Sequence, residues 1–232
     1  MNILAIDTSA VASSVAVCND FKLVGEMFIN VKLTHSQTLL PSCTSLLSAT
    51  TYTLDDIDLF AVSAGPGSFT GLRIGIAAIK GMALCKNKPI VAVSTLEALA
   101  HNLSGFDGIV CAVMDARCNQ VYNAIFESSV NGKQIRLCDD RALPIDELAT
   151  ELKSYDKNIF LVGDGAELCY NKIELKNIFL APEKARFAKG SSVGFIAFRD
   201  NEKAITADTL MPTYLRIPQA ERERNARLGL DK

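Results

Sequence analysis

The chain has 232 residues, of which 49% are hydrophobic, so it can bury a core large enough for one large domain or two similar halves. Its 24 basic and 26 acidic residues nearly cancel, which argues against the broad positive surface of a protein that binds nucleic acid by itself. The start MNILAIDTSA reaches an acid after a few apolar residues, and no later apolar run is long enough to cross a membrane. We therefore expect a cytosolic protein.

The 7 cysteines are an odd, scattered set without a C-x-x-C pair. This pattern argues against a disulfide framework and against a structural zinc site. We interpret most of them as small buried hydrophobic residues.

The first half predicts a three-stranded antiparallel meander from NILAIDTS, ASSVAVCN and KLVGEMFI. A helix follows with Thr34 or Ser36 as its cap and with apolar residues at helical spacing, and Pro41 must lie near its first turn or kink it. DLFAVSAG then predicts a buried strand, followed by a helix from Phe69 to about Lys86, the strand PIVAVST and the helix LEALAHNL.

The second half repeats this order. GIVCAVMDAR, QVYNAIFES and QIRLCDD predict a second meander, PIDELATELKSY a helix, NIFLVGDGA a strand and turn, and SSVGFIAFRD a last helix. The repetition is typical of a duplicated α/β fold of the actin-like ATPase type (ASKHA, ribonuclease H-like), with two lobes of mixed sheet and helices. We expect lobes at residues 1–104 and 105–217, followed by a charged tail at 218–232 that is solvated or ordered by a partner.

The stretch AGPGSFTGLRIG, between the fourth strand and the second helix, matches no phosphate-binding or nucleophile motif. Its two possible P-loop registers place Thr70–Gly71 or Leu72–Arg73 where Gly-Lys is required. The dinucleotide pattern G-x-G-x-x-G has Thr70 in place of its last glycine, and G-x-S-x-G fails because Ser68 directly follows Gly67. What remains is a tight turn at a helix N-terminus, a generic anion site beside two hydroxyls.

The helix after this turn carries Gly71, Gly75 and Ala78 on one side. A helical glycine costs about 1 kcal/mol relative to alanine, so we expect another backbone to approach closely there. The helix is apolar on nearly every side and must be covered on every side. Either the chain covers it alone or another subunit does, and the sequence leaves both interpretations open.

The segments MNILAIDTS, THSQTLLP, VSAGPGSFTGLRIG, VSTLEALA, MDARCNQVY, VGDGA and PTYLRIP occur in this order. Together they resemble the TsaB (YeaZ) family along nearly the whole chain, and GPGSFTGLRIG is the specific part. The resemblance implies a two-lobed actin-like fold and a role in bacterial synthesis of N6-threonylcarbamoyladenosine, in tRNAs that read ANN codons. It also implies a non-catalytic partner of TsaD, which transfers the threonylcarbamoyl group, with TsaE as an ATPase that joins the pair.

The same resemblance implies homodimers through the helices that otherwise meet TsaD. We hypothesise that AGPGSFTGLRIG forms a tight turn before an interface helix, in which Gly71 and Gly75 admit a partner helix, and that the first helix completes the shared helical layer. We therefore expect no catalytic residue, and a partner interface on these helices in which Arg73 reaches the partner or an anion. The expected interface residues are His35, Ser36, Leu39, Leu40, Cys43, Leu47, Gly71, Arg73, Gly75 and Ala78.

No metal site of the family type is expected. The catalytic relative holds its metal through H-x-x-x-H, because two imidazoles one helical turn apart can share one ion. Here Leu39 stands four residues after His35, and His101 belongs to another element. We interpret His35 as a histidine that hydrogen-bonds locally, and His101 as a charge partner of a helix C-terminus.

Nucleotide binding is expected to be weak or to depend on the partner, and no cofactor is expected to be required. In actin-like proteins two acids and their hairpins bind phosphates, and these places hold Asp7, Thr8, Ser9 and Asp115. The turns TSAVASS and ARCNQ contain no glycine, which makes close backbone approach to phosphate harder. The alternative is that the acids end strands and accept from turn amides. Similarly, Gly163–Gly165 either borders an adenine pocket or forms a plain turn.

Two other classes of function remain. A small-molecule kinase or ATPase of the same fold would bind and turn over ATP without a partner. A protease would need a nucleophile with its base, and the sequence has no such motif and only 2 histidines.

Overall fold

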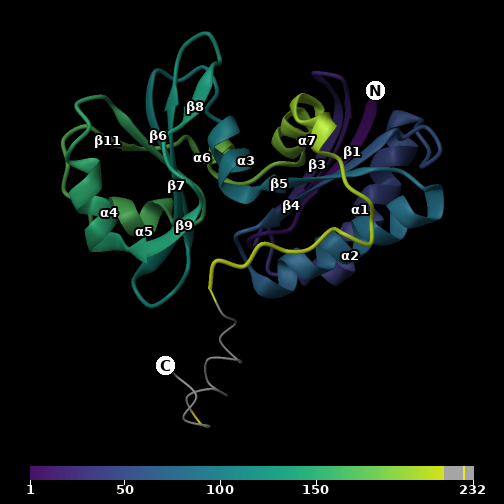
Figure 1. Ribbon diagram of the computed structural model, residues 1–232, viewed down its shortest axis with the longest axis horizontal. Helices are drawn as coiled ribbons and strands as arrows, with labels where there is room; N and C mark the ends of the chain where they lie inside the picture. The colour runs from purple at the N-terminus through teal and green to yellow at the C-terminus, as the bar shows by residue number, and fades with distance from the viewer. Residues whose placement is uncertain (217–226, 228–232) are drawn as a thin grey trace.

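The computed structural model describes residues 1–216 and 227 and has two lobes, each built on one β-sheet (Figure 1). The predicted tail at 218–232 lies outside the described residues except for Arg227. The first sheet has five strands in the order β3-β2-β1-β4-β5. Its strands are β1 (Asn2–Asp7), β2 (Ser13–Asn19), β3 (Lys22–Ile29), β4 (Leu59–Gly65) and β5 (Ile90–Ser94).

The predicted first meander is confirmed, because β1 pairs antiparallel with β2, and β2 with β3. Strand β4 joins β1 in parallel, as its unbroken apolar sequence indicates, and it is buried along its whole length. The acid that ends β1, Asp7, therefore lies beside the carboxyl end of β4, from which α2 starts.

The second sheet has six strands, of which β11-β10-β6-β7-β8 form a continuous order while β9 also pairs with β7. The last strand of the predicted second meander, QIRLCDD, is shortened to the three residues of β8, and β9, which follows it and pairs with the same neighbour, was not predicted. The three-residue strand β11 was not predicted, because so short a segment shows no periodicity. The strands are β6 (Gly108–Asp115), β7 (Gln120–Ser128), β8 (Gln134–Arg136), β9 (Arg141–Pro144), β10 (Ile159–Val162) and β11 (Ile178–Leu180).

Helices cover both faces of each sheet. The predicted helices form as α1 (His35–Thr50), α2 (Phe69–Lys86), α3 (Thr95–His101), α4 (Ile145–Leu152) and α7 (Gly190–Arg199). The short helices α5 (Ala166–Tyr170) and α6 (Glu183–Arg186) and a 3-10 turn at Asn201–Lys203 were not predicted. Pro41 lies inside α1, which continues through it. Within the described residues no helix is both long and apolar enough to cross a membrane.

Two helices are exchanged between the lobes (Figure 1). The apolar side of α3 packs on the second sheet, where Leu96 and Leu99 join a cluster with Val110. Conversely α7 packs on the first sheet, where Val193 and Ile196 join another cluster. The predicted boundary after residue 104 falls between the two sheets, while α7 packs on the first sheet and α3 lies between the lobes, with Ala98 in the core cluster of the first sheet.

The glycine side of α2 faces the chain's own first strand. A Cβ at Gly71 would lie 2.1 Å from the carbonyl oxygen of Thr8, and one at Gly75 would lie 2.3 Å from the Thr8 hydroxyl. The backbone that approaches these glycines is therefore internal, and the expectation that they admit a partner helix is wrong. Gly81, on the exposed side of the same helix, would place its Cβ in open space.

These two glycines predict opposite effects of the same substitution. Gly75→Ala should destabilise the chain by about 1–3 kcal/mol, because the added methyl group overlaps Thr8. Gly81→Ala should stabilise it by about 0.5–1 kcal/mol, because the methyl group meets nothing and alanine is the better helix former. Urea unfolding of both variants measures the difference, and equal effects would contradict the packing described for α2.

Candidate functional site

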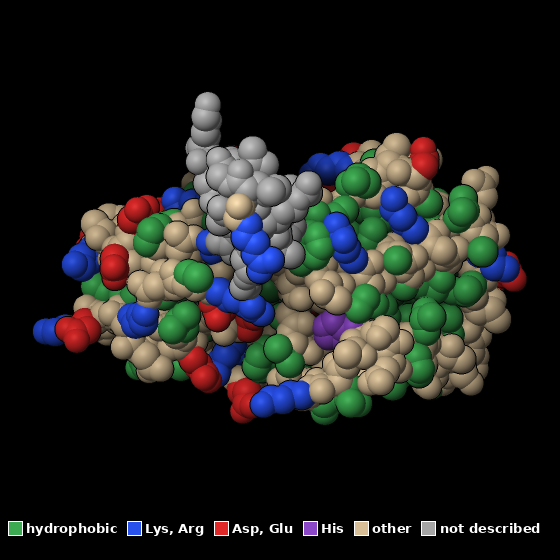
Figure 2. Space-filling view, turned by 90° about the horizontal axis from the view of Figure 1, so that it is seen from below, with side chains coloured by type: hydrophobic (Ala, Val, Ile, Leu, Met, Phe, Trp, Pro, Cys, Tyr) green, Lys and Arg blue, Asp and Glu red, His purple; other side chains and the backbone are tan. Residues whose placement is uncertain are grey.

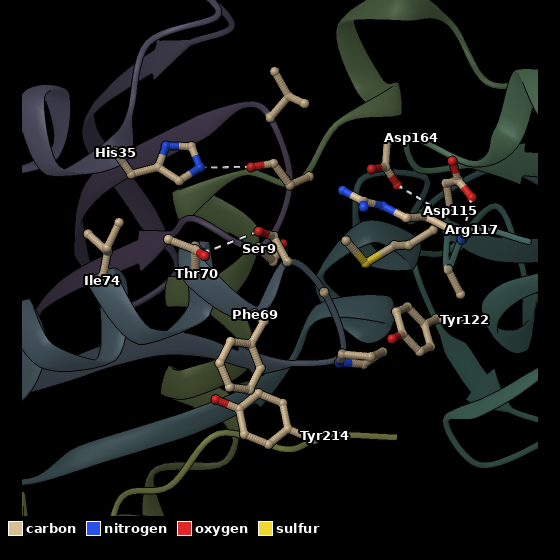
Figure 3. Close-up of a pocket in the computed structure, with 18 of the residues that line it drawn as sticks. Ser9, His35, Phe69, Thr70, Ile74, Asp115, Arg117, Tyr122, Asp164 and Tyr214 are labelled. Atoms are coloured by element: carbon tan, nitrogen blue, oxygen red, sulfur yellow. Dashed lines mark hydrogen bonds between the residues drawn. The ribbon is translucent and has the colours of Figure 1, made fainter. Parts of the chain in front are cut away.

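A cleft of about 700 Å³ lies between the lobes (Figure 3). Figure 3 shows His35, Thr70 and Ile74 on the wall of the first lobe and Asp115 and Asp164 on the opposite wall. Aromatic rings of Phe69, Tyr214 and Tyr122 lie at its lower margin in that view. The cleft thus offers acidic, basic and aromatic groups from both lobes.

The side chains of Asp7, Thr8 and Ser9, at the start of the turn after β1, are buried, while Ser9, Ala10 and Val11 also line the cleft. Asp7 accepts hydrogen bonds from the Ser9 amide at 3.1 Å and from the Ser9 hydroxyl at 3.0 Å. Burial raises the pKa of Asp7, while the hydrogen bonds from Ser9 oppose that rise. The hydroxyl of Thr8 donates to the Gly71 carbonyl at 2.8 Å. These side chains are therefore committed to the protein interior.

The N-terminus of α2 covers this turn. The Ser68 amide donates to the Ser9 carbonyl at 2.7 Å, and a Cβ at Gly67 would come within 2.5 Å of the same oxygen. The Ser68 hydroxyl accepts from the Gly71 amide, as an N-cap. The predicted nucleotide contacts of Asp7, Thr8 and Ser9 stay a prediction: these side chains are buried and hydrogen-bonded within the chain, whereas the Ser9 end of the turn lines the cleft.

The second lobe presents its acids to the cleft. Asp115 ends β6, is exposed, and accepts from the Arg117 amide at 2.7 Å. Asp164 accepts from the Asp115 amide at 3.3 Å and remains open to water within the cleft. Desolvation by the surrounding cleft walls raises the pKa of Asp164 to about 6, and the nearby Asp115 carboxylate adds to the rise. Sequence analysis did not single out Asp164, although it stands between two glycines that were noted.

Those two glycines serve the packing of the strand ends. A Cβ at Gly163 would lie 2.0 Å from the Val113 carbonyl, and one at Gly165 would lie 2.9 Å from the Met114 carbonyl carbon. The Gly163–Gly165 turn is therefore pressed onto β6, which supports the plain-turn interpretation over an adenine pocket.

The two histidines behave differently. His35 lines the cleft, and its Nε2 donates to the Ala10 carbonyl at 2.7 Å, so it is the locally hydrogen-bonded histidine expected. His101 ends α3 beside Phe195. Burial, and then the charge of Arg199, lower the pKa of His101, so its role as a charge partner of the helix terminus is not supported.

The expected interface residues divide into buried and exposed groups. Leu39, Cys43, Gly71 and Gly75 are buried within the chain, which corrects their assignment to a partner interface. His35, Leu47 and Ala78 are partly buried, and Ser36, Leu40 and Arg73 are exposed.

An exposed stripe runs along α2 at helical spacing and is formed by Arg73, Ala77, Gly81 and Leu84. Leu40 of α1 is a further exposed apolar side chain of the first lobe. Helices α1 and α2 pack against each other, and we call the exposed stripe of α2 together with Leu40 of α1 the α1–α2 face. The buried residues of these two helices form part of the hydrophobic core, whereas the residues of the α1–α2 face are exposed and lie outside it.

A C-terminal strap, residues 204–216, ties the lobes together at the cleft. Ile205 pairs with Ile90 at the edge of β5, and the Thr213 amide donates to the Ala64 carbonyl at 2.7 Å. The Arg216 guanidinium then donates to the Ala116 carbonyl of the second lobe at 2.7 Å. The position of the late motif PTYLRIP could not be predicted from the sequence, because only folding brings Tyr214 of this motif beside Arg73 of α2.

The raised pKa of Asp164 predicts a pH-dependent stability. The folded chain binds the Asp164 proton more tightly than the unfolded chain, so its stability falls as the pH rises from about 4 through about 6. Asp164→Asn should therefore stabilise the chain above this range, and the gain should vanish below about pH 4. Urea unfolding at several pH values tests this, with Asp156→Asn, an exposed aspartate of the same lobe, as the control for losing one charge. A gain that is constant with pH would contradict the assignment.

The sequence has clear relatives. A family model described as TsaD, tRNA N6-adenosine threonylcarbamoyltransferase, matches residues 29–191. The tRNA threonylcarbamoyladenosine biosynthesis protein TsaB of Bacillus subtilis (strain 168) is 32% identical over 225 residues, which cover 95% of this chain and 96% of that protein. The protein of the same name from Escherichia coli (strain K12) is 41% identical over 134 residues, covering 57% of this chain and 58% of that protein.

Solved structures agree with these relatives. YeaZ from Pseudomonas aeruginosa superimposes with a TM-score of 0.78 at 27% identity, covering 92% of this chain and 99% of that one. Component A of (R)-2-hydroxyglutaryl-CoA dehydratase from Acidaminococcus fermentans has a TM-score of 0.50 at 12% identity, covering 88% of this chain and 100% of that one, and is similar in fold alone. The duplicated actin-like fold predicted from the sequence is confirmed. By sequence over nearly its whole length and by fold, the chain belongs to the TsaB (YeaZ) family.

Proposed function

We propose that the chain is a non-catalytic subunit in the synthesis of N6-threonylcarbamoyladenosine in tRNAs that read ANN codons. Its curated relatives in Bacillus subtilis and Escherichia coli are named for the biosynthesis of this nucleoside. In the proposal the chain pairs with a TsaD-type catalytic subunit in the cytoplasm, and a TsaE-type ATPase joins the pair. The tRNA is contacted mainly through the complex, since the chain itself has a net charge of -2.

The observation that supports the non-catalytic role is the packing of α2 on the turn after β1, where the side chains of Asp7, Thr8 and Ser9 are buried and hydrogen-bonded within the chain. An actin-like ATPase needs open backbone amides there to approach a phosphate. In this chain α2 lies on the turn, and the Thr8 and Ser9 carbonyls touch the positions of Gly71 and Gly67. Opening the turn would require α2 to leave the first sheet, which would expose Leu72, Ile76 and Ile79 of the core.

The α1–α2 face supports the choice of docking surface. Leu84 is 74% exposed and Leu40 is 54% exposed, and Ala77 and Gly81 between them add no bulk. Such small exposed residues let a partner helix approach closely, and large exposed apolar side chains gain free energy when they are covered. Gly81 lowers the stability of the helix relative to alanine, and no contact within the chain requires a glycine there. Close approach of a partner helix would account for the glycine. The same face would form the homodimer when the chain is alone.

Substitution on this face should separate docking from folding. Leu84→Asp should weaken the complex with the TsaD-type subunit at least about tenfold, because a buried unpaired carboxylate is costly, and it should leave the melting temperature of the isolated chain nearly unchanged. Calorimetric titration with the TsaD-type subunit of the same organism measures the affinity, and threonylcarbamoylation of tRNA measures the activity.

Val130→Asp is the matched control, because Val130 is equally exposed but lies on the second lobe. Equal weakening by both variants, or none by Leu84→Asp, would contradict docking through the α1–α2 face. ATP turnover by the isolated chain would instead favour the alternative function, a small-molecule kinase or ATPase.

Nucleotide binding by the isolated chain should be weak. The side chains of Asp7, Thr8 and Ser9 are buried within the chain, and the acids that face the cleft, Asp115 and Asp164, repel phosphate when both are ionised. Equilibrium dialysis with labelled ATP should therefore show little binding to the chain alone and more binding when the TsaD-type subunit is present. Stoichiometric binding to the chain alone would refute this expectation.

A further inference from the structure

Arg73 is fixed in place at the end of the α1–α2 face that lies nearest the cleft. Its guanidinium carbon lies 3.8 Å from the centre of the Phe69 ring, and its Nε donates to the Tyr214 hydroxyl at 2.9 Å. The rings of Phe69 and Tyr214 stack with their centres 4.7 Å apart. A cation stacked on a ring and hydrogen-bonded at one nitrogen has lost most of its conformational freedom before any partner arrives.

The two terminal nitrogens of Arg73 remain available. Among residues 1–216 and 227, no acceptor lies within hydrogen-bond distance of Nη1 or Nη2, and the side chain is exposed. These two nitrogens form a planar fork that matches both oxygens of a carboxylate. The geometry therefore presents a prepared site for a carboxylate rather than a solvated charge with a random orientation.

Helices α1 and α2 carry no negative charge of their own: they contain no aspartate or glutamate, although the chain has 26 acidic residues. Of the basic residues on α2, Lys86 is paired with Asp55, and Lys80 interacts with the charge of Asp208 in the C-terminal strap. Figure 2 looks onto this side of the molecule, where hydrophobic and basic side chains gather over the first lobe and acidic ones lie at its margin.

We propose that Arg73 receives a side-chain carboxylate of the TsaD-type subunit, and that Tyr214 positions it for this contact. The inference rests on the proposed function and extends it, because it makes the C-terminal strap part of the docking surface. The stacked Phe69 belongs to the turn GPGSF, so this turn and the strap act together to hold the fork.

A carboxylate from a heterologous partner fits better than one from a second copy. A two-fold homodimer joins the same patch on both copies, so the α1–α2 face would meet itself. Neither helix contains an acid, so in a homodimer each Arg73 guanidinium would be buried opposite helices that offer it no carboxylate. Burying a charge without a partner costs desolvation free energy. We therefore infer that pairing with the TsaD-type subunit is favoured over self-association, and that Arg73 makes the difference.

The experiment compares Arg73→Gln with Lys80→Gln, a matched loss of one positive charge seven residues along the same helix. Arg73→Gln should weaken binding to the TsaD-type subunit by roughly 10- to 100-fold, as expected when one partner of a buried charge pair is removed. Lys80→Gln should weaken it by less than about threefold, and neither variant should weaken self-association in sedimentation. Thermal melting of each isolated variant controls for folding.

Tyr214→Phe tests the positioning role, since it removes the acceptor for Nε and keeps the stacked ring. It should weaken binding by roughly 3- to 10-fold, as the loss of one hydrogen bond to a charged group does, and it should add nothing in the Arg73→Gln background. Arg73→Lys should bind the TsaD-type subunit more weakly than the parent chain does, although it keeps the positive charge, because an ammonium group cannot offer the planar fork. The salt dependence of the affinity should also be smaller for Arg73→Gln than for the parent chain.

The outcomes separate this inference from the proposed function. If the parent chain binds the TsaD-type subunit and Arg73→Gln binds equally well, the carboxylate site is refuted and the proposed function stands. If Arg73→Gln weakens self-association as strongly as heterodimer formation, the carboxylate belongs to a second copy and the inference is overturned. If the parent chain does not bind the TsaD-type subunit at all, the proposed function itself fails.

Discussion

Backbone contact between the turn after β1 and the first turns of α2 is the constraint on which the other features depend. It exists because Gly67, Gly71 and Gly75 bring no side chain between α2 and the carbonyl and hydroxyl groups of residues 8 and 9. The contact holds the buried side chains of Thr8 and Ser9 against the first turns of α2. It also fixes the rotation of α2, so that its large apolar residues face the sheet and the stripe that begins at Arg73 faces outward.

The exchanged helices make the two lobes one structural unit. Because α3 completes the core of the second lobe and α7 that of the first, neither sheet is covered by its own half of the chain alone. Glu26 of β3 strengthens the exchange, since it accepts from the amide and the hydroxyl of Ser191 at the start of α7, each at 2.9 Å. The strap then adds contacts on the cleft side, from Ala64 in the first lobe to Ala116 in the second.

Much of the candidate site could be located from the sequence, but its orientation could not. The turn GPGSF, the two acids that end β1 and β6, and helices α1 and α2 were all found by their patterns. Periodicity could not show which side of α2 faces inward, because the helix is apolar on nearly every side. Asp164 was missed because no pattern marks an acid whose pKa is raised mainly by desolvation in a cleft that only the folded chain forms.

The sequence alone determined the order and type of the elements and, through the repeated order and the long motifs, the fold and the family. These properties are local: they follow from spacing, turn residues and apolar runs. Only the tertiary structure decided that the glycines of α2 face Thr8, that α3 and α7 change lobes, and that Tyr214 holds Arg73. Arg73 and Tyr214 are separated by 141 residues, and contacts between segments so far apart depend on how the whole chain packs rather than on any local pattern.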